Sequence, residues 1–292
     1  MATPWAGGET ECVPLSSRRL LPWSVGLLVL AVAAGCSSGR TAGSSSSEVS
    51  TSSAAPTAAS STIPPGLATK LKGVTAMTAL GDSVPYGTAC DCTPYPQLTG
   101  ADVARVGGHP AEISNDAKPG YRSGDVLAQL EHDANVIGHV EHSEAVMVEV
   151  GANDVAYSSA CATNVACYEK QVPQLTTNLE AIVGRIHELT AHHAVAVVLL
   201  DYWSVWLGGQ YATAQGQAYV DAADAVTTSV NDTIHTIAGA TDAIYVDLGT
   251  AFRGPDDAWD ETHLLAPDGD HPNAAGHERI TEAVAQAVIA FQ

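Results

Sequence analysis

Short apolar runs alternate with longer stretches of helical periodicity over residues 73–292. The apolar runs predict five strands, at residues 74–80, 111–114, 144–150, 194–200 and 243–246. Apolar residues at helical spacing predict four helices, at residues 124–137, 172–193, 214–238 and 273–291. Strands that are apolar throughout and alternate with helices are typical of a parallel sheet covered on both faces. The pattern therefore predicts an α/β fold whose functional groups lie beyond the carboxyl ends of the strands.

The first 72 residues have a different pattern. Arg18 and Arg19 precede an apolar stretch that ends in "AVAAGC" at Cys36 and is short for a membrane-spanning helix. This ending resembles a bacterial lipobox, which implies a signal peptide over 1–36 and lipidation of Cys36. The protein would then sit on the outer face of the bacterial cell membrane as a lipoprotein. Plain secretion and a retained membrane anchor are the alternatives.

Residues 37–72 contain many Ser, Thr, Ala and Pro residues and little apolar bulk. Such a composition cannot bury enough surface to fold, so this segment is expected to be a disordered tether. The folded domain is expected to span residues 73–292.

The chain carries 12 basic and 32 acidic residues, a formal charge of −20. Binding to nucleic acid or to an anionic membrane surface needs basic patches, so this balance argues against both. The only expected membrane contact is the N-terminal lipid, and the folded domain is expected to be a monomer.

Four cysteines remain in the folded domain once Cys12 and Cys36 are set aside: Cys90, Cys92, Cys161 and Cys167. An even number in an exported chain favours two disulfides. Three pairings are open, and we favour Cys161–Cys167 with Cys90–Cys92. The spacings "CDC" and "CATNVAC" lack the paired short spacings of a zinc site, so no metal is expected.

Candidate catalytic residues follow several of the predicted strands. Ser83 comes after the first strand, Gly120 after the second and Asn153 after the third, and Asp268 and His271 lie in the loop after the fifth. A serine becomes a nucleophile when a histidine takes its proton and a carboxylate orients that histidine. The oxyanion formed on attack needs preorganised N–H donors. Alone, each short motif is more often a turn, but their joint order predicts an acyl-transfer site.

These blocks resemble those of the SGNH hydrolases, the GDSL-type esterase and lipase superfamily. "GDSVPYG", "NDAKPG", "GAND" and "DGDHPNAAGH" match the four blocks of that family in order. The resemblance covers roughly residues 74–292 and is greatest to exported actinobacterial-type members. It implies a flavodoxin-like three-layer sandwich with a five-stranded parallel sheet. It also implies Ser83, Asp268 and His271 as catalytic residues, with the oxyanion hole formed by Ser83, Gly120 and Asn153.

The expected activity is an exported serine ester hydrolase that acts on short-chain acyl esters without a cofactor. The ester substrate could be a small molecule, an acylated glycan or a lipid. One alternative is a glycan deacylase or transacylase of the cell envelope, and another is a non-catalytic substrate-binding lipoprotein. Two tryptophans after the fourth strand, Trp203 and Trp206, are expected either to fill the core or to form a wall for the substrate.

Overall fold

The computed structural model describes residues 73–290. The predicted signal peptide, the tether and Cys36 all lie outside these residues. None of the helices within 73–290 combines the length and the apolar character that crossing a membrane requires.

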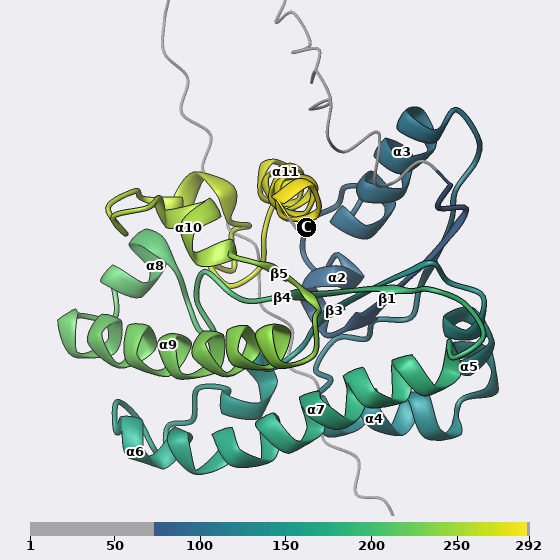
Figure 1. Cartoon of the computed structure of the whole chain (residues 1–292). Coiled ribbons are helices and arrows are strands. Elements are labelled where there is room, and N and C mark those ends of the chain that lie inside the picture. Colours follow the sequence, from purple (N-terminus) through teal and green to yellow (C-terminus); the bar gives the residue numbers. More distant parts are fainter. Residues whose placement is uncertain (1–72, 291–292) are drawn as a thin grey trace, which may run out of the picture. The chain divides into compact units, whose positions relative to one another are not determined.

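Five parallel strands form the central sheet (Figure 1). They are β1 (Ala76–Gly81), β2 (Glu112–Asn115), β3 (Ala145–Glu149), β4 (Ala196–Leu200) and β5 (Ile244–Val246), in the order β2-β1-β3-β4-β5. All five coincide with the predicted apolar runs, with shifts of one or two residues at their ends. In β1 and β3 Val146, Val148, Ala79 and Leu80 are at most 1% exposed. Burial on both faces explains why β1 and β3 have continuous apolar sequences, whereas the edge strand β2 is partly exposed.

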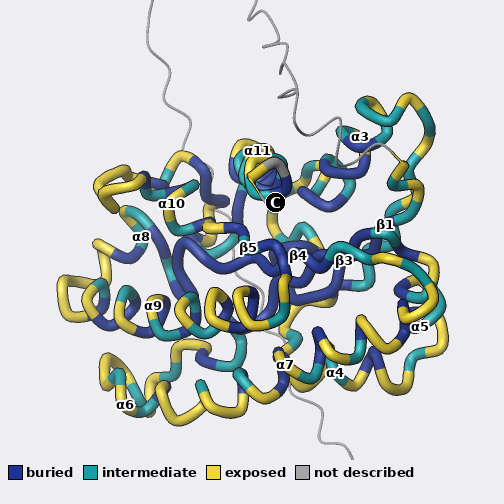
Figure 2. Tube along the Cα trace, in the orientation of Figure 1, coloured by how far each residue is buried: buried dark blue, intermediate teal, exposed yellow. Residues whose placement is uncertain are grey.

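Helices cover both faces of the sheet. On one face lie α3 (Tyr95–Gly107), α10 (Leu248–Arg253) and α11 (Ala274–Ala290), and α11 packs against both α3 and β5. On the other lie α4 (Ser123–His132), α5 (Ala134–Glu141), α7 (Val172–Leu189) and α9 (Gln217–Ala240). The dark tube in Figure 2 shows the buried sheet between more exposed helices. The predicted three-layer α/β fold is therefore confirmed.

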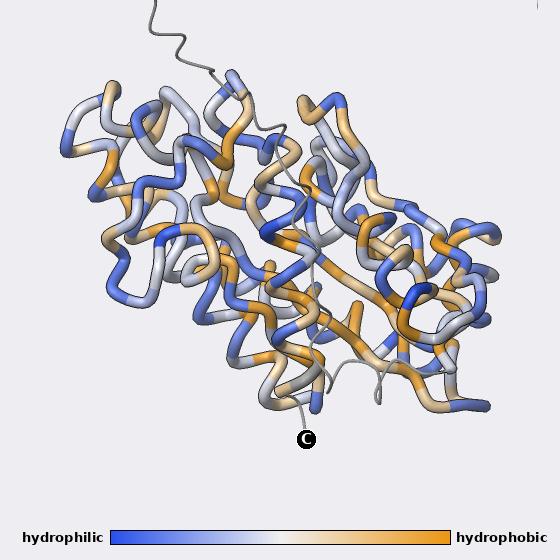
Figure 3. Tube along the Cα trace, turned by 90° about the horizontal axis from the view of Figure 1, so that it is seen from above, coloured by the Kyte–Doolittle hydropathy of each residue, from blue (hydrophilic) through white to orange (hydrophobic). Residues whose placement is uncertain are grey.

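Short elements lie in the connections: α2 (Ser83–Tyr86), α6 (Val165–Tyr168), α8 (Gly209–Thr213) and the 3₁₀ turns η1 (Ala152–Val155), η2 (Glu169–Gln171) and η3 (Glu261–Leu264). Seen from above, the strands carry the most hydrophobic stretches, and much of the hydrophilic sequence lies in the surrounding helices and loops (Figure 3). The long connections that follow the carboxyl ends of the strands can therefore hold a functional site.

The helix predicted over 124–137 is wrong as a single element. The structure divides it into α4 and α5 at Asp133, whose extended backbone ends one helix and begins the next. The Asp133 side chain accepts hydrogen bonds from the amides of Asn135 and Val136, at 3.0 and 3.4 Å. A carboxylate that caps a new helix N-terminus competes with continuation of the old helix.

Candidate active site

Ser83 begins the short helix α2 directly after β1. Asp82 precedes it as the N-cap, and its carboxylate accepts the Val84 amide at 3.1 Å. The second carboxylate oxygen of Asp82 accepts the Tyr202 hydroxyl at 2.7 Å, and Asp82 is only 1% exposed. Asp82 therefore fixes the turn that presents Ser83.

His271 reaches Ser83 from the loop that precedes α11. The His271 Nε2 atom lies 2.9 Å from Ser83 Oγ, across 188 positions of sequence. The His271 Nδ1 atom lies 2.8 Å from Asp268 Oδ2, and the His271 backbone amide donates to Asp268 Oδ1 at 3.1 Å. With Nδ1 protonated and donating to Asp268, Nε2 is left to accept the Ser83 proton.

Asp268 has the electrostatics of an ionised partner for His271. Partial burial by itself would raise its pKa. Hydrogen bonds from the His271 ring and from the amides of His271 and Asp270 more than offset this effect, so the pKa of Asp268 falls below its ordinary value. The carboxylate is therefore charged at neutral pH and able to stabilise a protonated His271.

The two predicted donors outside the Ser83 turn lie on neighbouring loops. Asn153 lies in η1, and its Nδ2 donates to the Tyr121 carbonyl at 3.0 Å, which leaves its second N–H for another acceptor. Gly120 precedes Tyr121 with a positive φ of 81°. The Lys118 amide ties this loop to the Gly81 carbonyl at 3.0 Å. Asn153 lines the cavity at Ser83, whereas Gly120 does not, and the donor role of Gly120 stays a prediction.

A cavity of about 340 Å³ opens at Ser83 and His271. Aromatic side chains form one wall, with the ring of Trp206 5.2 Å from that of Tyr157 and 5.4 Å from that of Tyr219. Trp206 also donates from Nε1 to the Val155 carbonyl at 2.8 Å. The position of Trp206 supports the interpretation that it forms a wall for the substrate. Trp203 is fully buried and stacks on Phe252 at 4.2 Å, so it serves mainly as core.

Buried acids lie beneath the Ser83 turn. Glu149, at the end of β3, is fully buried, and neither of its carboxylate oxygens has a hydrogen-bond partner among the described residues. Burial raises the pKa of Asp82 to about 6. Burial, together with the nearby charge of Asp82, raises the pKa of Glu149 well above its ordinary value. Burial thus favours the protonated form of Glu149, an effect that no sequence pattern indicated.

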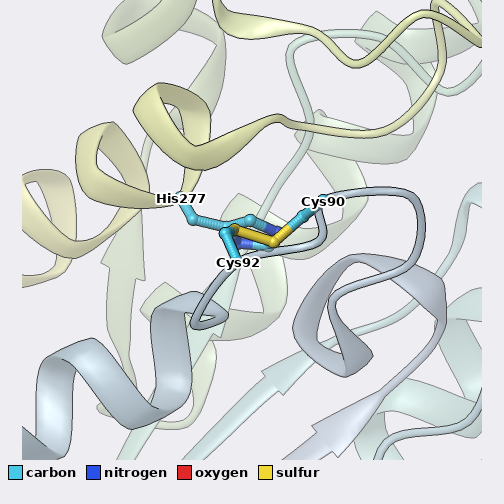
Figure 4. A group of neighbouring side chains, drawn as sticks. All are labelled: Cys90, Cys92 and His277. Carbon is cyan, nitrogen blue, oxygen red and sulfur yellow. A yellow bond between two sulfur atoms is a disulfide. The ribbon is translucent and has the colours of Figure 1, made fainter.

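Both favoured disulfides are present in the structure, Cys90–Cys92 and Cys161–Cys167. The Cys90–Cys92 bridge lies beside His277, and within residues 73–290 these three form the single close group of metal-ligand side chains (Figure 4). The two sulfurs bond to each other, so neither is a thiolate that could hold a metal. His277 instead accepts the Tyr95 amide through Nδ1 at 3.2 Å. This donor set does not fit a metal centre.

Three site residues escaped the sequence reasoning. Tyr202 and Tyr219 were not singled out, although Tyr202 holds Asp82 and Tyr219 lines the cavity. Asp270 also lines the cavity beside His271. Of these three residues, only Tyr202 could have been found from the sequence, because it directly precedes Trp203 in the aromatic cluster after the fourth strand.

Known proteins share both sequence pattern and fold with this chain. The model of the GDSL-like lipase/acylhydrolase family matches residues 79–279. A lipase from a goat rumen metagenome has 18% identity and a TM-score of 0.58, over 74% of this chain and 98% of its own. An acetyl-xylooligosaccharide esterase from Geobacillus has 18% identity and a TM-score of 0.54, over 75% and 95%. The extracellular lipase of Streptomyces rimosus has 23% identity and a TM-score of 0.55, over 73% and 99%.

These three structural likenesses show a shared fold, and no curated protein matches the sequence itself. The family match carries the assignment, because it covers most of the described residues and includes Ser83, Asn153, Asp268 and His271. On that match, the chain belongs to the GDSL-like lipase/acylhydrolase family of ester hydrolases.

Proposed function

We propose that this protein hydrolyses short-chain carboxylic esters through a covalent acyl-enzyme on Ser83. The observation that carries the proposal is the continuous hydrogen-bonded series Ser83–His271–Asp268, with heavy-atom distances of 2.9 and 2.8 Å. Distances of this size allow a proton to pass from the serine to the imidazole as the serine attacks.

In the first half-reaction, Ser83 Oγ bonds to the ester carbonyl carbon while His271 Nε2 takes the hydroxyl proton. The carbonyl oxygen becomes an oxyanion, which the free Asn153 N–H and the backbone amides near Ser83 are placed to stabilise. The carbon–oxygen bond to the alcohol then breaks, and His271 returns the proton to the leaving alkoxide. Asp268 keeps its charge throughout and stabilises the protonated imidazole.

In the second half-reaction, water replaces the alcohol. His271 takes a proton from water as its oxygen attacks the acyl carbon, and the bond to Ser83 breaks with return of that proton to Oγ. The products are the free carboxylic acid and the restored serine. Every proton is supplied and recovered by His271, so the reaction needs no cofactor.

The cavity supports a short acyl group. Its volume of about 340 Å³ lies at the small end of ligand sites. Its aromatic wall combines apolar ring faces with the polar edges of Tyr157 and Tyr219, which suits a polar alcohol better than a triglyceride.

The test compares turnover of p-nitrophenyl acetate by the wild type, Ser83→Ala and Ser229→Ala. Ser229 lies on α9, where its hydroxyl donates to the Ala225 carbonyl at 3.2 Å, and it serves as the matched control. We expect Ser83→Ala to lose several orders of magnitude in kcat and Ser229→Ala to match the wild type. Near-normal turnover by folded Ser83→Ala would exclude the proposed nucleophile.

A further inference from the structure

A second cavity adjoins the one at Ser83. It has a volume of about 250 Å³ and shares two lining residues with the first, Ser204 and Leu207. The Gly208 amide donates to the Gly269 carbonyl at 2.9 Å, so the wall between the cavities is tied to the loop that carries Asp268 and His271. The second cavity therefore has a fixed position relative to the proposed ester site.

An exposed tryptophan lines this second cavity. Trp259 is 55% exposed, among the largest apolar exposures of the described residues. Its amide donates to the Arg253 carbonyl at 2.8 Å. Its ring lies over Gly254, where a Cβ atom would come within 2.6 Å of ring atoms. The glycine thus leaves room for an indole that packs against the backbone and keeps much of its surface in water. Apolar surface held exposed in this way is typical of a binding site.

Charged and polar side chains line the same cavity as the Trp259 ring. Arg253 Nη1 lies 2.8 Å from Asp224 Oδ1, and Arg253 Nε lies at an ion-pair distance of 2.7 Å from Asp257 Oδ1. Among the described residues, nothing hydrogen-bonds to the second carboxylate oxygen of either aspartate. Gln210 Nε2 donates to Asp260 Oδ2 at 2.9 Å, at another part of the cavity wall. The cavity that Trp259 lines therefore also contains carboxylate acceptors whose positions are partly fixed.

A carbohydrate ligand would match this combination of an exposed aromatic ring and carboxylate groups. A sugar ring presents an apolar C–H face that can stack on an indole, and hydroxyl edges that donate to carboxylates. The excess of carboxylates over Arg253 disfavours a phosphorylated or otherwise anionic ligand, as does the charge of −20 for the whole chain. A purely apolar ligand would leave these carboxylates without partners.

We propose that the second cavity binds a neutral sugar unit of the substrate, adjacent to the ester that occupies the Ser83 cavity. This inference rests on the proposed esterase function and names its substrate class: a short acyl ester on a neutral oligosaccharide. Sugar binding acts before the chemical step and positions the ester, so it is expected to affect the acylated sugar and not an ester that lacks one.

The experiment compares Trp259→Ala and Trp259→Phe with the wild type on two substrates, a neutral O-acetylated disaccharide and p-nitrophenyl acetate. We expect Trp259→Ala to lose about tenfold or more in kcat/KM on the disaccharide, chiefly through KM, and to match the wild type on p-nitrophenyl acetate. Trp259→Phe keeps a stacking face and is expected to lose less.

Two further measurements separate this proposal from the esterase function. Ser83→Ala protein is titrated with the unacylated neutral disaccharide in a calorimeter, with an anionic disaccharide of the same size as control. Saturable binding of the neutral sugar that Trp259→Ala abolishes supports the proposal. Absence of binding overturns it, as does an equal loss on both ester substrates. Loss of p-nitrophenyl acetate turnover in Ser83→Ala tests the esterase function independently of either result.

Discussion

Gly81 and Glu149 are register partners at the carboxyl ends of β1 and β3, and their backbones approach closely. A side chain on Gly81 would begin 2.0 Å from the Glu149 carbonyl oxygen, and Gly81 has a φ of 144°. The same carbonyl accepts the Asp82 amide at 3.2 Å. The glycine of "GDS" is thus required by the approach of a neighbouring strand, and this approach sets the turn from which Ser83 projects.

Asp268→Asn is expected to lower kcat by about 10²–10⁴ with little change in KM. The amide can still accept the backbone N–H groups of Asp270 and His271, but it holds no charge to stabilise a protonated imidazole. Steady-state kinetics on p-nitrophenyl acetate measures the effect, with thermal unfolding as the control for folding. A kcat within threefold of the wild type would remove Asp268 from the proposed mechanism.

Asn153→Ala is expected to lower kcat by about 10²–10³, with a smaller change in KM, because its N–H acts on charge that develops during attack. The variant also loses the bond to the Tyr121 carbonyl, so its melting temperature must be measured alongside its kinetics. A change confined to KM would show that Asn153 contacts only the ground state of the substrate.

The stability of the protein is expected to respond to pH through its buried carboxyl groups. Burial raises the pKa of Asp201 to about 7, from an ordinary value of 3.8. The folded state then binds a proton that the unfolded state has released. The resulting stabilisation is complete below pH 4 and is lost as the pH rises through about 7. The raised pKa values of Asp82 and Glu149 are expected to make the protein less stable as the pH rises, like that of Asp201.

Asp201→Asn cannot titrate, so its melting temperature is expected to fall less than that of the wild type between pH 5 and pH 8. The difference in the free energy of unfolding at the two ends of this range is expected to be a few kcal/mol, or about 1.4 kcal/mol for each unit of pKa shift. Melting curves across the range, in one buffer series, provide the comparison. Parallel curves for the two proteins would contradict an elevated pKa at Asp201.

The strands and the order of the site residues were predictable from local sequence. Runs such as "EAVMVEV" are typical of buried strands, and parallel topology brings the residues that follow them to one edge. The break at Asp133 was not predictable, because the apolar spacing continues through it. The competing cap becomes evident only where the Asp133 carboxylate meets the next two amides.

Long-range packing explains what the sequence left open in the site. Trp203 and Trp206 are three positions apart in one loop and both line the cavity, yet Trp203 stacks on Phe252 and Trp206 packs against Tyr157. The raised pKa of Glu149 depends on complete burial between separate segments of the chain. Trp259 lies in an unremarkable acidic loop, and its cavity forms only where η3 and α8 meet.

Esters of increasing chain length test the size of the acyl site. Each buried CH₂ contributes about 0.8 kcal/mol, so a long groove would lower KM steadily as the chain lengthens. The cavity of about 340 Å³ predicts instead that kcat/KM on p-nitrophenyl esters peaks between acetate and hexanoate and drops by palmitate. A maximum at twelve carbons or more would indicate a lipase with an extended apolar site.

The most direct test of the central claim is a mass map of the protein after reaction with a fluorophosphonate, which bonds to an activated serine. Ser83 is the only serine between Lys72 and Arg105, so the tryptic peptide 73–105 reports on it alone. We predict one adduct per chain, on that peptide, and no adduct in folded Ser83→Ala. An adduct on another peptide, or undiminished labelling of Ser83→Ala, would contradict the assignment of Ser83 as the nucleophile.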